Sequence, residues 1–195
     1  MGAPTERHDE DEELVQRTLA RQTDAFGQLY EKYRERVFRV AFHFVHNQTD
    51  ALDLCQEAFV RAYESLATFR GQSRFSTWLM RIAANTCVDH CRHARVRRAG
   101  ELDERMVTGD ERVPSATANP NPAQGLEREE ARAALDAAIA QLSPEHRAVF
   151  VLHAVEGMSY EEIAQAIGCP IGTVMSRLHY ARKRLRGLLA WLDRG

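Results

Sequence analysis

The sequence has no apolar run long enough to span a bilayer and no secretory leader ahead of its acidic first residues. Its four cysteines, Cys55, Cys87, Cys91 and Cys169, form no CxxC pair, which favours reduced thiols over a disulfide framework. It also lacks a glycine-rich nucleotide-binding loop and a credible catalytic dyad. These absences predict a cytoplasmic protein that is not an enzyme and needs no cofactor.

Charge is present in quantity but is unevenly distributed along the 195 residues. The chain carries 26 Lys and Arg against 28 Asp and Glu, which gives a formal net charge of −2. Residues 9–13 form an acidic run, whereas residues 177–186 are strongly basic. Local patches therefore say more about binding partners than the net charge does.

Residues 157–186 have the pattern of a helix-turn-helix. Ser159 and Glu162 can form a capping box at the start of a first helix, and Gly168 can adopt the left-handed conformation that ends it. Pro170 fits the first turn of a second helix, where its missing N–H costs nothing. The apolar stripe of that second helix consists of Val174, Leu178, Ala181, Leu185 and Leu188.

The opposite face of the second helix is polar and basic, as a helix that enters the major groove requires. Its polar positions and their flanks are Gly172, Ser176, Arg177, His179, Tyr180, Arg182, Lys183, Arg184 and Arg186. The backbone at Gly172 and Thr173 can approach a phosphate closely. A solvated amphipathic helix is the alternative, but the capped first helix, the tight turn and the basic second helix together favour DNA binding.

In the N-terminal half, apolar residues recur at spacings of three and four from Glu10 to Phe44, which predicts helix there. Asn47 or Thr49 can cap the next helix. The predicted buried face of that helix is Leu52, Cys55, Phe59, Ala62, Tyr63 and Leu66. The opposite face is Asp53, Gln56, Glu57, Val60, Arg61 and Glu64. Periodicity alone does not decide whether this opposite face is solvated or docks a protein.

Aromatic and basic residues alternate just before a further helix, which we expect over residues 77–98. Arg70 and Arg74 lie among Phe69, Phe75 and Trp78, a mixture that suits single-stranded nucleic acid because bases stack on rings and cations follow phosphates. The alternative is that the rings, Phe75 and Trp78 especially, are core anchors at a helix junction. One face of the helix carries Arg81, Asn85, Asp89 and Arg92.

The same helix contains Cys87, His90, Cys91 and His93, which raise the question of a zinc site. On one continuous helix these side chains do not converge, and a structural zinc site usually takes its ligands from two elements. We therefore expect no metal.

Composition changes over residues 100–125, where prolines occur among Ser, Thr, Ala, Asn and acidic residues with little periodicity. A helix restarts at Leu126, and its expected core positions are Ala131, Leu135, Ala138, Ile139 and Leu142. The chain is therefore expected to be all-α: two small helical domains (1–98 and 126–195) joined by a flexible linker (99–125), with a helix-turn-helix in the C-terminal domain.

Three groups of motifs together carry a family resemblance. The first is DLCQEAF at residues 53–59. The second combines residues 69–71, 75–79 and 81–85 with Asp89 and Arg92. The third combines residues 142–144, 159–164 and 172–185. In this order and spacing they resemble the DLxQExF segment, the promoter-melting region and the upstream-promoter reader of bacterial extracytoplasmic-function (ECF) sigma factors, the minimal class of RNA polymerase sigma subunits.

The resemblance implies a transcription initiation factor that binds core RNA polymerase and promoter DNA, with a cognate anti-sigma factor as a further partner. Residues implied in docking on core polymerase are Asp53, Gln56 and Glu57. Residues implied in binding the minus-ten element are Arg70, Arg74, Trp78, Arg81, Asn85 and Arg92. Residues implied in binding the minus-thirty-five element are Thr173, Ser176, Arg177, His179, Tyr180, Arg182 and Lys183. Met175 and Tyr180 depart from the basic residues that many relatives carry, which bears on the DNA sequence preferred.

Two other functions are compatible with parts of the sequence. A stand-alone helix-turn-helix regulator, with an N-terminal domain that senses a ligand or dimerises, would bind duplex DNA tightly without polymerase. A metal-dependent enzyme built on Cys87, His90 and Cys91 would hold stoichiometric metal.

Overall fold

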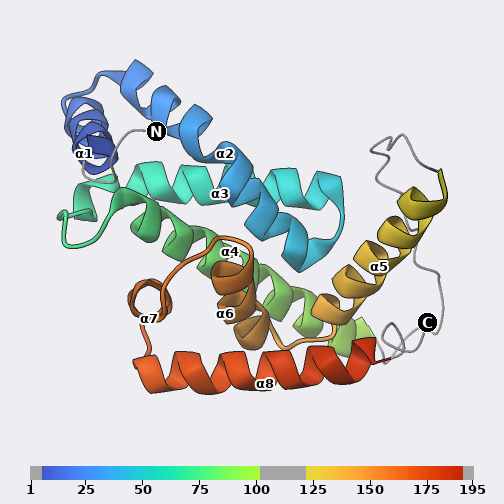
Figure 1. Ribbon diagram of the computed structural model, residues 1–195. Helices are drawn as coiled ribbons and strands as arrows, with labels where there is room; N and C mark the ends of the chain where they lie inside the picture. The colour runs from blue at the N-terminus through green and yellow to red at the C-terminus, as the bar shows by residue number, and fades with distance from the viewer. Residues whose placement is uncertain (1–5, 102–121, 191–195) are drawn as a thin grey trace.

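The computed structural model describes residues 6–101 and 122–190, and these residues form eight α-helices and one short 3-10 helix without any strand (Figure 1). The N-terminal domain contains α1 (Glu6–Leu19), α2 (Thr23–Val45), α3 (Gln48–Ser65), η1 (Leu66–Thr68) and α4 (Phe75–Glu101). The C-terminal domain contains α5 (Pro122–Ala140), α6 (Pro144–Ala154), α7 (Tyr160–Ile167) and α8 (Ile171–Leu189). None of the helices in these ranges combines the length and apolar character that crossing a membrane requires.

Helix α4 continues to Glu101 and α5 begins at Pro122, so both helices overlap the range 99–125 predicted for the linker. Residues 102–121 lie outside the described residues.

The helix expected from Glu10 to Phe44 is two helices, so that prediction is wrong in its continuity. Arg21 adopts a left-handed conformation (φ 66°) between α1 and α2, and this reversal lets α1 fold back along α2. The buried Asp11 of α1 then accepts hydrogen bonds from Lys32 Nζ (2.8 Å) and the Tyr33 hydroxyl (2.5 Å) of α2. Periodicity missed the break because apolar spacing is maintained on both sides of it.

Helix α3 begins where the sequence indicates and buries most, but not all, of the predicted face. The Asn47 side chain accepts hydrogen bonds from the first turn, as predicted. Leu52 and Tyr63, expected in the core, are 47% and 49% exposed. Cys55, Phe59 and Ala62 are buried as predicted. Ala51 and Ala58 are buried beside them, because small side chains let helix axes approach more closely.

In the C-terminal domain, the last two of the four helices, α7 and α8, form the predicted helix-turn-helix. The capping box forms in both directions, between Glu162 N and Ser159 Oγ (3.2 Å) and between Ser159 N and Glu162 Oε2 (2.9 Å). Gly168 ends α7 at φ 70°. Pro170 precedes α8 as its N-cap, one position earlier than predicted. On α5, Ala138 and Ile139 are buried toward α8 as expected, whereas Leu135, also expected in the core, is exposed.

The two domains pack directly on each other, which the sequence did not predict. Helices α6 and α7 lie between α4 and α8 (Figure 1). One continuous hydrophobic cluster includes Met80 and Cys87 of α4 together with Val149, Met158 and Ile163 of the C-terminal domain. A smaller cluster joins α5 to α8. The described parts of the chain therefore form one packed body rather than two separate ones.

Candidate nucleic-acid and docking surfaces

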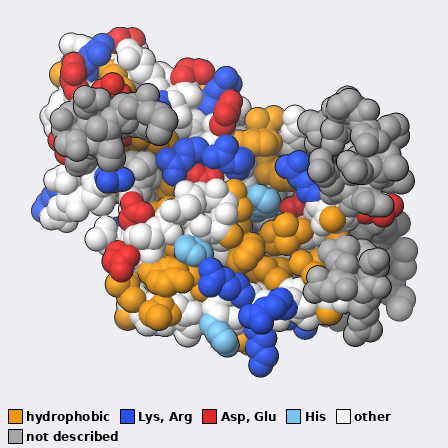
Figure 2. Space-filling model, in the orientation of Figure 1, with side chains coloured by type: hydrophobic (Ala, Val, Ile, Leu, Met, Phe, Trp, Pro, Cys, Tyr) orange, Lys and Arg blue, Asp and Glu red, His pale blue; other side chains and the backbone are white. Residues whose placement is uncertain are grey.

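Helix α8 presents its polar residues on one outward face. Val174, Leu178, Ala181 and Leu185 are all buried against α5, α6 and α7, which confirms the predicted stripe and fixes the rotation of the helix. The residues exposed on the other side are Ser176, His179, Tyr180, Arg182 and Lys183. Lys and Arg side chains gather near the edge of the molecule where α8 runs (Figure 2). Two of the predicted minus-thirty-five residues, Thr173 and Arg177, are half-buried at the margin of this exposed face of α8.

One ring contact links the α8 face to α6. The Tyr180 ring lies 4.7 Å from the ring of His146, centroid to centroid, with the planes tilted by 37°. Burial and the nearby charge of Arg177 lower the pKa of His146, which favours its neutral form at pH 7. The Tyr180 side chain remains more exposed than buried, so this contact orients the ring without covering it.

Two apolar side chains also lie exposed on α8. Ile171 and Met175 are four residues apart and therefore adjacent on the helix surface, and Met175 is 53% exposed. From the sequence, Met175 is only a departure from related proteins, and neither residue belongs to a predicted site. Because neither residue falls on the buried stripe of α8, the spacing along the helix could have predicted that both are exposed.

Helix α3 presents a surface of different chemistry, which we call the α3 face: Leu52, Asp53, Gln56, Glu57, Val60 and Tyr63, all exposed. The structure thus brings the three predicted docking residues together on one helix and adds three apolar ones. The sequence places Val60 on this face but assigns Leu52 and Tyr63 to the core. Their spacing of eight and three residues is that of a single helical stripe.

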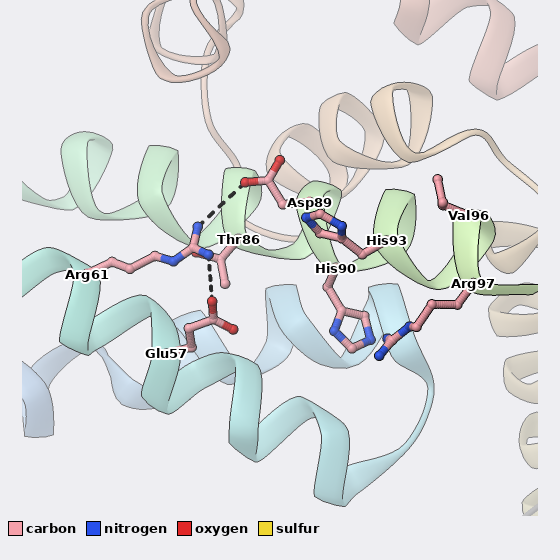
Figure 3. A pocket seen from close by; sticks show the side chains of 8 residues that line it. All are labelled: Glu57, Arg61, Thr86, Asp89, His90, His93, Val96 and Arg97. Carbon is pink, nitrogen blue, oxygen red and sulfur yellow. Dashed lines mark hydrogen bonds and ion pairs between the residues drawn. The ribbon is translucent and has the colours of Figure 1, made fainter.

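Arg61 connects α3 to α4 beside this face (Figure 3). Its guanidinium contacts Glu57 Oε1 at 2.6 Å and Asp89 Oδ2 at 3.6 Å. All three side chains are partly exposed, so these ion pairs contribute little to stability. Glu57 and Asp89 can therefore exchange Arg61 for another partner at small cost.

A hollow of about 390 Å³ lies between α3 and α4 next to Arg61. His90 and His93 line it but point in different directions (Figure 3). Within the described ranges, no three His, Cys, Asp or Glu side chains gather as a metal ion would need. Cys87 is buried, and burial raises the pKa of its thiol far above the ordinary value, so it stays protonated and is a poor ligand.

Asn85 lines a second hollow, which adjoins the first because Arg61 and Asp89 line both. The remaining lining residues are Arg61, Glu64, Ser65, Thr68, Ile82 and Asp89. Part of the Asn85 side chain is accessible there. An amide in an open polar hollow can both donate and accept hydrogen bonds, which is what recognition of the edge of an unpaired base requires.

The loop before α4 is held by a cluster of three rings. Phe75 is fully buried, as predicted for a core anchor, and its ring lies 5.8 Å from that of Phe69 and 5.6 Å from that of Trp78. Trp78 is half-buried, so part of its ring remains available. Arg70 and Arg74 are exposed on the loop itself.

Arg81, Asn85 and Arg92 lie along one accessible face of α4, in agreement with the predicted spacing. Arg92 differs from the others because its guanidinium Nη2 lies 2.8 Å from Glu145 Oε1 of α6. This hydrogen bond lowers the pKa of Glu145. One predicted minus-ten residue is therefore engaged by the C-terminal domain.

Comparison with known proteins places this arrangement in a family. Residues 29–97 match the model of Sigma-70 region 2, and residues 132–185 match that of Sigma-70, region 4. The chain is 37% identical to the RNA polymerase sigma-H factor of Pseudomonas aeruginosa over 182 residues, which cover 91% of this chain and 92% of the relative. It is 35% identical to the ECF RNA polymerase sigma-E factor of Escherichia coli K12 over 177 residues, covering 90% of this chain and 92% of that one.

Solved structures give the same result for the fold. The sigma factor RpoE from Bartonella quintana, in complex with the anti-sigma factor NepR, matches with a TM-score of 0.64 and 27% identity over 85% of this chain and 96% of that one. CnrH in complex with the cytosolic domain of CnrY matches with a TM-score of 0.64 and 28% identity over 93% and 97%. The chain belongs to the ECF group of the sigma-70 family, whose members are transcription initiation factors and not enzymes.

Proposed function

We propose that this protein binds core RNA polymerase in the cytoplasm and directs it to promoters by contacting a minus-ten and a minus-thirty-five element. The observation that carries the proposal is the match to both sigma regions in one chain, with the residues implied for each contact on accessible faces of α3, α4 and α8. We assign polymerase docking and minus-ten binding to residues 1–98 and minus-thirty-five binding to residues 126–195.

The α3 face is the proposed docking surface for core polymerase. It combines acidic Asp53 and Glu57 with the exposed apolar side chains of Leu52, Val60 and Tyr63. An apolar stripe with a charged margin is typical of a protein interface, where burial supplies affinity and charge supplies register. The solvated alternative does not explain why three large apolar side chains share this face.

The accessible face of α4 and the loop before it are the proposed minus-ten site. Asn85 would hold one extruded base of the non-template strand in its hollow, and the exposed part of Trp78 would stack on a neighbouring base. Unstacking a base costs a few kcal/mol, which such contacts must supply. Arg70, Arg74 and Arg81 would follow the phosphates, and Arg92 would join them once Glu145 has moved away.

The exposed face of α8 is the proposed minus-thirty-five site. Its N-terminal turns would enter the major groove, where Ser176, His179 and Tyr180 can reach base edges. Arg177, Arg182 and Lys183 would contact phosphates on both sides of the groove. Thr173, in the first turn, would approach a phosphate with its backbone N–H.

An anti-sigma factor is a proposed further partner. Both solved relatives with a TM-score of 0.64 match over most of this chain, and the sigma factor from Bartonella quintana was solved in complex with an anti-sigma factor. A partner of that kind would compete with polymerase or promoter DNA for the surfaces described above.

The experiment that tests the proposal is run-off transcription with purified core polymerase and a promoter library. We expect transcripts from a defined subset of promoters only when the chain is present. A stand-alone regulator would instead bind duplex DNA tightly without core and give no transcript with it, and that result would reject the proposal.

A further inference from the structure

One side of α8 is apolar where the helix begins and basic farther along. Ile171, Met175 and His179 follow one another at intervals of four residues, so their side chains form one row on the helix surface. Ile171 is 40% exposed and Met175 is 53% exposed. Arg182 and Arg186 continue the same side of the helix toward its C-terminal end, and both are exposed. The row therefore offers apolar surface first and positive charge afterwards.

Packing within the chain does not account for the apolar start of this row. The buried stripe of α8, from Val174 to Leu185, already holds the helix against the rest of the C-terminal domain. Neither Ile171 nor Met175 belongs to the hydrophobic clusters of the described residues. Hydrophobic side chains are visible where α8 begins, and Lys and Arg side chains follow along the helix (Figure 2). The apolar pair is therefore available to a partner.

Gly172 leaves the start of α8 open to close approach. It is not in the left-handed conformation that favours glycine. A Cβ placed there would meet nothing within 4 Å in the described part of the chain beyond the local helix backbone. Glycine nevertheless destabilises a helix relative to alanine. Since neither the backbone nor packing requires glycine here, a partner that approaches the first turn closely explains it.

The chemistry of the row fits the major groove of duplex DNA. The C5-methyl group of thymine is the apolar feature among the base edges of that groove, and phosphates line its margins. A helix whose start meets base edges and whose later turns meet phosphates would carry apolar residues first and cations afterwards. Helix α8 also contains no Asp or Glu, which favours a polyanion over a protein as the partner of this side.

We propose that Ile171 and Met175 recognise thymine methyl groups in the minus-thirty-five element, so that the chain selects a T·A pair where the N-terminal turns of α8 meet the groove. Ser176 supports the same pair. Its hydroxyl donates to the Thr173 carbonyl (3.0 Å), which leaves acceptor lone pairs for the N6 amino group of adenine. This inference rests on the proposed minus-thirty-five function of α8 and adds the base that the helix prefers.

Replacing thymine by deoxyuridine tests the proposal, because it removes the methyl group and keeps every hydrogen-bonding group of the base. Holoenzyme is assembled from core polymerase and the full-length chain, and bound to a promoter duplex obtained from the run-off library. Each thymine of the minus-thirty-five element is then replaced in turn. We expect at least one replacement to weaken binding of the wild type about fourfold, which corresponds to the burial of one methyl-sized group.

The double variant Ile171→Ala, Met175→Ala should abolish this sensitivity, so that thymine and deoxyuridine duplexes bind within about 1.5-fold of each other. Both positions are exposed and alanine favours helix, so the fold should be retained. Leu135→Ala is the matched control, because it removes an apolar side chain of similar exposure (39%) from α5. It should keep the full difference between the two duplexes.

Three results would overturn the proposal. The first is a wild type that responds to none of the thymine replacements, and the second is an undiminished response in the double variant. The third is a double variant that loses affinity for core polymerase and keeps its response to the methyl group, which would assign the apolar pair to protein docking. A wild-type holoenzyme that transcribes from no promoter would instead reject the sigma function, and this inference with it.

Discussion

The α3 face and the exposed face of α8 are helix surfaces of opposite chemistry. The α3 face combines two carboxylates with Leu52, Val60 and Tyr63, whereas the α8 face carries Arg182, Lys183 and hydrogen-bonding side chains. Acidic and apolar groups suit a protein partner, and cations with polar groups suit nucleic acid. The difference indicates that one small chain presents separate surfaces to two classes of macromolecule, and it predicts opposite responses to salt and to mutation.

Reversing charge on the α3 face should have the largest effect. The double variant Asp53→Lys, Glu57→Lys would place two cations where the partner surface is complementary to acids, and such mismatches cost several kcal/mol. We expect at least about a hundredfold weaker association with core polymerase by fluorescence anisotropy. The control is Glu31→Lys on α2, an exposed acid outside the face. If the double variant associates with core polymerase as tightly as the wild type, the α3 face is solvated and does not dock core.

The Asn85→Ala variant should separate melting from docking. Loss of a base contact is worth about 1–3 kcal/mol, so we expect open-complex formation to fall about ten- to a hundredfold while core binding stays within about twofold. Permanganate reactivity of unpaired thymines measures the first, and anisotropy the second. Equal losses in both assays would place Asn85 in the docking surface rather than the minus-ten site.

The apolar part of the α3 face can be tested with two leucines of almost equal exposure. Leu52 is 47% exposed on this face and Leu19 is 43% exposed at the end of α1. Leu52→Ala should weaken core association by about 1 kcal/mol at both low and high salt, because the loss is of apolar burial. Leu19→Ala should leave core association unchanged. Equal effects of the two substitutions would mean that the stripe on α3 has no special role.

On the α8 face, one cation should behave as one phosphate contact. Lys183→Ala should lower duplex affinity of the holoenzyme and flatten the dependence of affinity on salt by about one ion. Arg34→Ala, which removes an exposed cation on α2, is the control. The prediction fails if the salt slope of Lys183→Ala matches that of the wild type, since Lys183 would then face water.

The smallest expected effect is a dependence of the free energy of unfolding on pH. Burial lowers the pKa of His46 at the end of α2, so the folded state prefers the neutral ring. The stability gained is therefore complete above about pH 6.5 and declines below it. We expect the melting temperature to fall by a few degrees between about pH 7.5 and about pH 5.5.

His46→Asn should reduce this pH dependence, since asparagine tolerates the left-handed conformation that His46 adopts (φ 52°) and does not titrate. An identical dependence in the variant would exclude His46 as its source. Asp136 acts at lower pH: burial raises its pKa, but the His43 ring, whose Nδ1 lies 3.5 Å from Asp136 Oδ1, outweighs burial and leaves the pKa below the ordinary value. Its contribution is lost only as pH falls through that lowered pKa.

The sequence predicted best those features that local hydrogen bonds decide. The capping box of Ser159 and Glu162, the left-handed Gly168 and the Asn47 cap all formed as expected, because each depends on a few neighbouring residues. The outward face of α8 was also predicted correctly, since one clear apolar stripe fixed the rotation of the helix. The exposed residues of α8 could therefore be predicted together.

Features decided by helix packing were predicted less well. On α3, Leu52 and Tyr63 compete with small alanines for the core, and periodicity cannot tell which of two neighbouring stripes turns inward. Glu156 accepts a hydrogen bond from Arg36, 120 positions away in the chain, and no local pattern marks such a contact. The roles of individual residues toward DNA and polymerase remain proposals for the experiments above.

The most direct test of the central claim is permanganate footprinting of one promoter. The promoter is probed with core alone, with the chain alone, and with core and chain together. We predict reactive thymines around the minus-ten element only when core and chain are present together, with weak duplex binding by the chain alone. Tight duplex binding by the chain alone, with no reactive thymines after core is added, would contradict the claim.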